Sequence, residues 1–139
     1  SPDFISVMHS FWADLGGAHG NGGVENTNID MVSGKLLQIG DVFSEAAAAE
    51  LMTQCKDKII AEKRQRLEGE AYDPAQDPSL SDEVIAEHVA TMSRWSFTAR
   101  EASVSFDAYA IGSYAEGSYD CTFDMKDVKA LALPDAPLP

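Results

Sequence analysis

Apolar residues change their spacing several times along this chain, and each change marks a predicted element. Residues 3–13 carry apolar side chains at both odd and even positions, which is typical of an inner strand covered on two faces. Periodicity alone leaves a helix open for this stretch. Residues 24–31 and 35–39 alternate apolar and polar side chains on either side of Ser33-Gly34, so they predict a β-hairpin.

Helical spacing follows the hairpin. Ser44 is the predicted N-cap of a helix over residues 45–67, a stretch without Gly or Pro, and Gly69 is its predicted end. Lys63 is expected to lie away from most of the apolar face of this helix. The residues that share this face at helical spacing are Ala48, Leu51, Met52, Cys55 and Ile59.

A loop and a second helix come next. The two Asp-Pro steps within residues 69–80 disfavour helical geometry, and Asp73 and Asp77 are predicted to be solvated turn residues. Ser81 is the predicted N-cap of a helix over residues 82–92.

From Arg94 onward the apolar period becomes two, which predicts three antiparallel strands with one solvated face each. Their apolar positions are Trp95, Phe97 and Ala99; Ala102, Val104, Phe106 and Ala108; and Tyr119, Cys121, Phe123 and Met125. The resulting order, β-ββ-α-α-βββ, predicts an α+β fold in which two helices pack on one face of a mostly antiparallel sheet. We expect one domain over residues 1–132 and a poorly ordered, proline-rich tail over residues 133–139.

Acidic residues dominate the charge of the chain. There are 23 Asp and Glu against 10 Lys and Arg, for a net charge of -13. A field of this sign repels nucleic acid and anionic lipid and favours encounter with a cationic partner, although it also serves solubility alone. No run approaches the roughly 20 apolar residues that cross a bilayer, so we expect no membrane insertion of this domain.

The two cysteines lie on predicted apolar faces that point toward the same core. Cys55 is on the first helix and Cys121 on the last strand. A disulfide between them would fit an exported protein, and two buried free thiols are the alternative.

A histidine set in glycines is the first candidate site. His19 stands within the sequence GGAHGNGG of residues 16–23, where glycine permits positive φ or a close approach of the backbone. His19 has three alternative roles: a catalytic base, a metal ligand, or a side chain that joins two loops. The sequence holds no GxSxG nucleophile motif, HExxH spacing or CxxC pair, so we favour the structural role and expect no metal, cofactor or catalytic residue.

A second glycine-rich corner, IGSYAEG, is the other candidate. Tyr109 and Tyr114 lie in or beside it together with Glu116, and Tyr119 follows. Aromatic residues at a corner either form a recognition surface or cap the end of a sheet. We expect a ligand groove between the two corners, formed by His19, Asn21, Tyr109, Tyr114 and Glu116.

These motifs together resemble a known family. GGAHGN, then NIDMVSGKLLQIGDVF, then FDAYAIGSYAEG follow one another in the order typical of the RsiV-like extracytoplasmic domain. That domain forms the C-terminus of an anti-sigma factor and also occurs in a peptidoglycan deacetylase and in bacterial lipoproteins. The match covers about residues 10–130. Ser113 stands where the family usually has Pro, Ser33 replaces a Thr, and Arg100-Glu101-Ala102 lacks a common Gly.

The resemblance implies an extracytoplasmic domain that binds rather than catalyses. In the anti-sigma factor the domain senses lysozyme, a basic protein, by binding it. The implied partners here are a basic protein or a peptidoglycan-related ligand, with no nucleic acid, and the oligomeric state stays open. The alternative function is an accessory domain of a cell-wall hydrolase or deacetylase with His19 at the site. The chain begins Ser-Pro-Asp-Phe, so any targeting segment is expected to precede it.

Overall fold

The fold is α+β, as the sequence predicts. A computed structural model describes residues 3–67 and 71–139; the predicted helix end at Gly69 lies outside the described residues. The strands are β1 (Phe4–Ala13), β2 (Asn21–Asp30), β3 (Lys35–Leu36), β4 (Trp95–Phe97), β5 (Glu101–Phe106) and β6 (Tyr119–Asp124). The α-helices are α1 (Ile39–Val42), α2 (Glu45–Arg66), α3 (Asp82–Val89) and α4 (Met125–Leu131), and the short 3-10 turns are η1 (Pro74–Gln76), η2 (Met92–Arg94) and η3 (Tyr114–Glu116).

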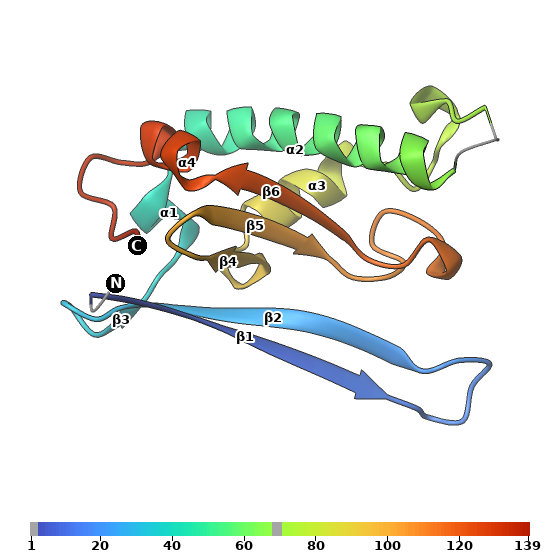
Figure 1. Ribbon diagram of the computed structural model, residues 1–139, viewed down its shortest axis with the longest axis horizontal. Helices are drawn as coiled ribbons and strands as arrows, with labels where there is room; N and C mark the ends of the chain where they lie inside the picture. Colours follow the sequence, from blue (N-terminus) through green and yellow to red (C-terminus); the bar gives the residue numbers. More distant parts are fainter. Residues whose placement is uncertain (1–2, 68–70) are drawn as a thin grey trace.

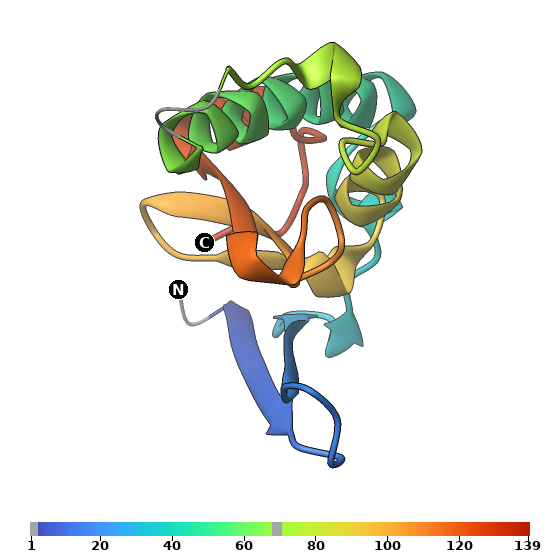
Figure 2. The same cartoon turned by 90° about the vertical axis from the view of Figure 1, so that its right-hand side faces the viewer.

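The strands form two sheets rather than the single predicted sheet. One is ordered β1-β2-β3 and the other β4-β5-β6, and all pairs are antiparallel. Helices α2 and α3 cover one side of the second sheet, while the long β1–β2 ribbon lies on its other side and projects away from it (Figures 1 and 2). The fold is therefore layered, with the helices and the ribbon on opposite sides of the second sheet.

The prediction of a doubly covered inner strand over residues 3–13 is wrong. These residues form β1, a strand at the edge of its sheet, and only Phe4 is buried. Phe11 and Trp12 are 58% and 69% exposed. The pattern misleads because apolar residues on both faces of a strand usually mean two covering layers, and here the described residues supply little cover on either side.

The two predicted helices are confirmed together with their caps. The hydroxyl of Ser44 accepts a hydrogen bond from the Ala47 N–H, and that of Ser81 accepts one from the Val84 N–H. Every fourth residue of α2 is buried: Ala47, Leu51, Cys55, Ile59 and Lys63. The placement of Lys63 away from the core is therefore wrong, because it continues the buried row by one further turn.

Three short segments differ from the sequence-based expectation. The predicted strand over residues 35–39 is confined to β3 because Ile39 already begins α1, and the helix α4 follows β6 directly. The tail, expected to be poorly ordered, lies on the body of the molecule. The N–H of Leu133 donates to the carbonyl of Val42 at 2.8 Å, and Ala136 and Leu138 pack against the core.

Side-chain amides and a hydroxyl hold the ribbon against the second sheet. Asn28 of β2 donates to the carbonyls of Met92 and Trp95 at 3.1 and 2.8 Å. The hydroxyl of Ser6 on β1 accepts from the N–H of Phe97 at 3.2 Å. Buried polar side chains of this kind fix the register between layers, because an alternative register would leave them without partners.

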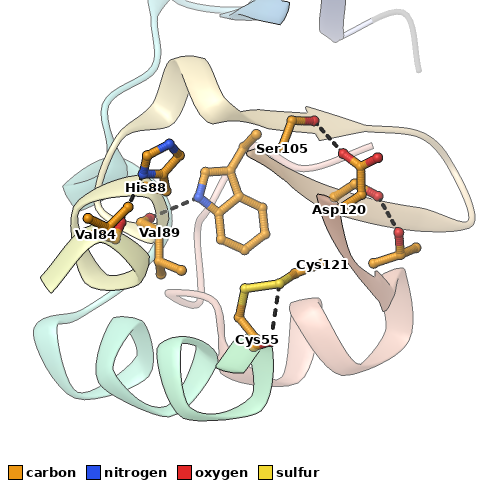
Figure 3. The surroundings of a disulfide bond; sticks show 10 residues. Cys55, Val84, His88, Val89, Ser105, Asp120 and Cys121 are labelled. Atoms are coloured by element: carbon orange, nitrogen blue, oxygen red, sulfur yellow. Dashed lines mark hydrogen bonds between the residues drawn. A yellow bond between two sulfur atoms is a disulfide. The ribbon is translucent and has the colours of Figure 1, made fainter. Parts of the chain in front are cut away.

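A disulfide joins Cys55 of α2 to Cys121 of β6 across the core, with their Cα atoms 5.3 Å apart (Figure 3). Both residues are fully buried. Indole Nε1 of the buried Trp95 donates to the Val89 carbonyl at 2.9 Å in the same core. The bond ties the main helix to the last strand of the sheet that it covers.

Loss of this disulfide is expected to destabilise the fold strongly. The bond closes a loop of 66 residues, and the chain-entropy relation assigns about 4 kcal/mol to a loop of that size. Urea unfolding of the oxidised protein, of the reduced protein and of the Cys55→Ala, Cys121→Ala double variant measures this difference. Two titratable thiols in the denatured, non-reduced protein, or equal stability of all three forms, would contradict it.

Candidate functional site

His19 lies between two tyrosines that come from the other end of the chain. Its Nε2 lies 2.8 Å from the hydroxyl of Tyr109, and its ring stacks on that of Tyr114 with centroids 3.7 Å apart. Its Nδ1 lies 3.1 Å from the carbonyl oxygen of Gly20, which also accepts a hydrogen bond from the hydroxyl of Tyr114 at 3.0 Å. We call His19, Tyr109 and Tyr114 the aromatic corner. Both ring nitrogens of His19 are engaged, so the imidazole joins the two loops.

The backbone of Tyr109 is strained within this corner. Its φ of 74° lies in the left-handed region, which is rare for a bulky residue. Such a conformation costs on the order of 1 kcal/mol and persists only where the surroundings hold it. The contact with His19 helps to hold it, and the tyrosine ring remains exposed.

The glycines beside His19 serve close packing more than unusual backbone angles. In the described stretch 16–23, only Gly16 has a positive φ. A Cβ at Gly20 would lie 2.2 Å from the indole of Trp12, and one at Gly23 would lie 2.7 Å from the ring of Phe11. Glycine at these positions lets the two aromatic side chains of β1 lie across the start of β2.

An open groove of about 360 Å³ runs beside the aromatic corner. It separates the end of the β1–β2 ribbon from the loop between β5 and β6, so residues of both glycine-rich corners line it. The lining residues are Trp12, Gly22, Gly23, Val24, Asp107, Ala108, Tyr114, Gly117 and Ser118. The carboxylate of Asp107, which lines the groove, accepts hydrogen bonds from the Val24 N–H at 2.9 Å and from the Arg94 guanidinium at 2.7 Å.

The remaining predicted site residues do not join the aromatic corner. Asn21 is exposed at the first position of β2, opposite Ala13. Glu116 lies close to Tyr114 in sequence, but its carboxylate faces the end of α2. Of the five residues, the structure brings together His19, Tyr109 and Tyr114. Sequence reasoning missed Trp12, whose signal is a tryptophan opposite a glycine in a hairpin.

A buried lysine organises a second cluster behind the corner. The side chain of Lys63 is 1% exposed, and its Nζ donates to Asp77 at 2.7 Å, to Glu116 at 3.1 Å and to Ser79 at 3.2 Å. The rings of Tyr72 and Tyr119 lie within 6 Å of the ammonium, at 5.8 and 5.5 Å. We call Lys63, Asp77 and Glu116 the buried ion cluster. The prediction of Asp77 as a solvated turn residue is wrong, because it supplies the closest counter-charge to a buried cation.

The cluster shifts the titration of its acidic members. Burial by itself would raise the pKa of Asp77, but the Lys63 ammonium and the Ser79 and Tyr72 hydroxyls lower it well below its usual range. Burial by itself would also raise the pKa of Glu116, but the Ser113 N–H, the Tyr119 hydroxyl and Lys63 lower it below its usual value. Burial and the neighbouring carboxylates raise the pKa of both Tyr72 and Tyr119. Both carboxyl groups are therefore ionised at neutral pH.

Within residues 3–67 and 71–139, the other histidines and the acidic residues form no metal site. Among the residues that the structure describes, no group of three or more His, Cys, Asp or Glu side chains could hold a metal ion. His88 stacks on the ring of Phe106 with centroids 4.6 Å apart, and its Nδ1 lies 2.8 Å from the Val84 carbonyl. Over the same described ranges, no helix is long and apolar enough to cross a membrane.

Comparison with known proteins shows the fold. No family model and no curated protein matches the chain. It superposes on a DUF3298 family member from Bacteroides fragilis with a TM-score of 0.70 at 17% identity, covering 96% of this chain and 50% of that one. A DUF3298 family protein from Pseudomonas aeruginosa gives 0.60 at 17% identity, over 99% and 58%. The chain thus has the fold of these DUF3298 structures and spans 50% and 58% of their lengths.

The buried ion cluster predicts a loss of stability in acid. The pKa values of Asp77 and Glu116 are lower in the folded state than in the unfolded state. Their contribution to the free energy of unfolding is therefore complete above the unfolded pKa of about 4, and it is lost as the pH falls toward the folded pKa values. Asp77→Asn should lower the free energy of unfolding by about 3 kcal/mol at pH 7, because it leaves Lys63 less compensated. Below pH 4 the variant should lose less stability than the parent.

Urea unfolding between pH 2 and pH 7 measures both effects. Asp73→Asn is the matched control, since Asp73 is an exposed carboxylate in the same loop and the amide can still accept the Ala75 N–H. If the free energy of unfolding falls by the same amount with pH in the parent and in Asp77→Asn, the ionised Asp77 does not stabilise the fold.

Removal of the imidazole should loosen the glycine-rich loop. His19→Ala deletes the stacking on Tyr114 and the contact with Tyr109, and we expect a loss of about 1 kcal/mol. Amides of Ala13, Asn21 and Gly23, at the strand ends that adjoin this loop, should exchange faster with deuterium. His19→Phe keeps a stacked ring and should retain most of the protection. If His19→Ala exchanges like the parent, the imidazole does not join the loops.

Proposed function

We propose that this chain is a non-enzymatic binding or sensory domain of the RsiV-like extracytoplasmic type, and that its partner is a basic protein. The observation that carries the proposal is the aromatic corner. The exposed rings of Trp12 and Tyr114 line one groove of an acidic molecule, and the exposed ring of Tyr109 lies beside that of Tyr114. Aromatic residues at a rigid corner are typical of recognition surfaces, since they give contact area at little conformational cost.

Charge and geometry support the same proposal. A net charge of -13 favours diffusional encounter with a cationic surface. The indole of Trp12 is 69% exposed and can receive a Lys or Arg side chain on its ring. The strained backbone of Tyr109 adds support, because strain in an exposed residue concentrates at functional sites.

An extracytoplasmic location is part of the proposal. The disulfide between Cys55 and Cys121 suits an oxidising compartment. The shared fold with DUF3298 structures is consistent with the motif resemblance to RsiV-like domains. The alternative, an enzyme accessory role with His19 as base, has less support because both nitrogens of His19 already face partners within 3.1 Å.

Calorimetric titration with lysozyme as the basic protein tests this function. We expect binding that weakens as salt rises, and a loss of at least tenfold in affinity for Tyr114→Ala. Tyr114→Phe keeps the stacked ring and should bind nearly as the parent does. Val32→Ala removes an exposed apolar side chain at the far end of the ribbon and should have no effect.

Three outcomes would contradict the proposal. They are no binding to lysozyme or another basic protein, equal binding to a neutral protein of the same size, and unchanged affinity of Tyr114→Ala. Binding to peptidoglycan fragments instead would assign the corner to a cell-wall ligand. Turnover of peptidoglycan that disappears in a folded His19→Ala variant would favour the enzymatic alternative.

A further inference from the structure

The proposed function leaves the open edge of β1 unused. β1 is ten residues long, about 33 Å, and stands at the edge of the sheet β1-β2-β3. Protein sheets usually protect such an edge with charged side chains, Pro or a covering element. β1 contains no Pro, Lys, Arg, Asp or Glu, although 24% of the chain is charged.

The main-chain groups along this edge point outward in a defined pattern. Phe4 pairs with Asp30, and the N–H of Met31 donates to the carbonyl of Asp3 at 2.9 Å. In antiparallel pairing this bond flanks a non-hydrogen-bonded pair, so Phe4 and every second residue after it direct N–H and C=O away from β2. Those residues include Ser6, Met8 and Ser10. They form a template for one further strand.

Exposed apolar side chains lie beside the template. Ile5, Val7 and Phe11 of β1 share the face that also carries Ile29 and Leu36, because Ile5 pairs with Ile29 and Ile29 with Leu36. The opposite face of the ribbon carries Ser6 and Asn28, which bind the second sheet. Val7, Phe11 and Leu36 are 41%, 58% and 61% exposed. The same face carries His9, Glu25 and Thr27 near the middle of the ribbon, and the exposed apolar side chains lie on either side of them.

We propose that the edge of β1 binds an additional β-strand with alternating apolar side chains, supplied by polypeptide of the same protein beyond these 139 residues. The solved DUF3298 structures carry such additional length, since this chain covers 50% and 58% of them. A second copy fits less well. Two molecules of net charge -13 repel one another, whereas a linked strand is already present at high effective concentration.

Hydrogen–deuterium exchange of β1 in two proteins tests this proposal: the 139-residue chain and the complete gene product. In the shorter chain the amides of Ser6, Met8 and Ser10 should exchange freely. In the complete product they should exchange at least about 100-fold more slowly, because each then donates to the added strand. This test is independent of lysozyme binding, so it can fail while the proposed function holds.

A proline variant separates strand pairing from other kinds of cover. Ser10→Pro in the complete product removes one outward N–H and should restore fast exchange at Met8, while Ser10→Ala should not. In the 139-residue chain Ser10→Pro should leave the protection of β2 unchanged, since the N–H of Ser10 does not face β2. That measurement reports whether the ribbon itself still forms.

Several results would overturn the proposal. Equal exchange of β1 in both proteins would do so, as would a gene product that ends with these 139 residues. Protection in the shorter chain that grows with concentration would assign the edge to a second copy. Slow exchange at Met8 that survives Ser10→Pro would mean that a covering element, and not a paired strand, protects β1.

Discussion

The buried ammonium of Lys63 is the constraint on which the arrangement of the loops depends. A cation that is 1% exposed needs counter-charges within hydrogen-bonding distance, because its desolvation would otherwise outweigh the packing of α2. Asp77 and Glu116 supply these charges from two loops that are distant in sequence. Glu116 also accepts the N–H of Ser113, so the ion pair fixes the turn that carries Tyr114. The ion pair between Lys63 and Glu116 thus helps to position the Tyr114 ring of the aromatic corner.

The ribbon meets this corner from the other side, and its own attachment is polar. Asp107 binds the N–H of Val24 and the guanidinium of Arg94, while Arg94 also donates to the carbonyl of Val24 at 3.0 Å. Main-chain and side-chain groups of three segments therefore meet at one carboxylate. With this attachment in place, His19 at the end of the ribbon lies within contact distance of Tyr114. The candidate site is a junction of two separately fixed parts.

The ribbon also explains why one strand of this protein is so apolar. Trp12 faces the groove at one end of β1, while Val7 and Phe11 lie on the outer face. The proposed partner and the proposed strand would therefore contact different groups of the same element. A single strand with apolar side chains on both faces can serve both, which a strand with one polar face could not.

Local patterns determined much of the secondary structure before any tertiary information. Ser44 and Ser81 cap the helices that the sequence predicts, because capping depends on residues within one turn. The alternation around Trp95, Val104 and Cys121 likewise predicts the three strands of the second sheet, since each has one buried face. The glycines around His19 predicted a loop, and this loop contacts the tyrosines. They did not predict that Gly20 and Gly23 pack against Trp12 and Phe11.

Tertiary structure alone decided what covers each face and which distant groups meet. The apolar residues of β1 predict burial on two sides, but burial depends on the layers that surround a strand, and the described residues leave this one open. Lys63 is expected from the sequence to lie away from the apolar face, but it continues the buried row of α2, and only the contacts with Asp77 and Glu116 make a cation tolerable there. The sequence by itself therefore determined α2 and α3 with their N-caps and the strands of the second sheet, because those depend on neighbours along the chain. The division into two sheets, the buried charge and the aromatic corner arise from contacts between residues far apart in sequence, which no local pattern encodes.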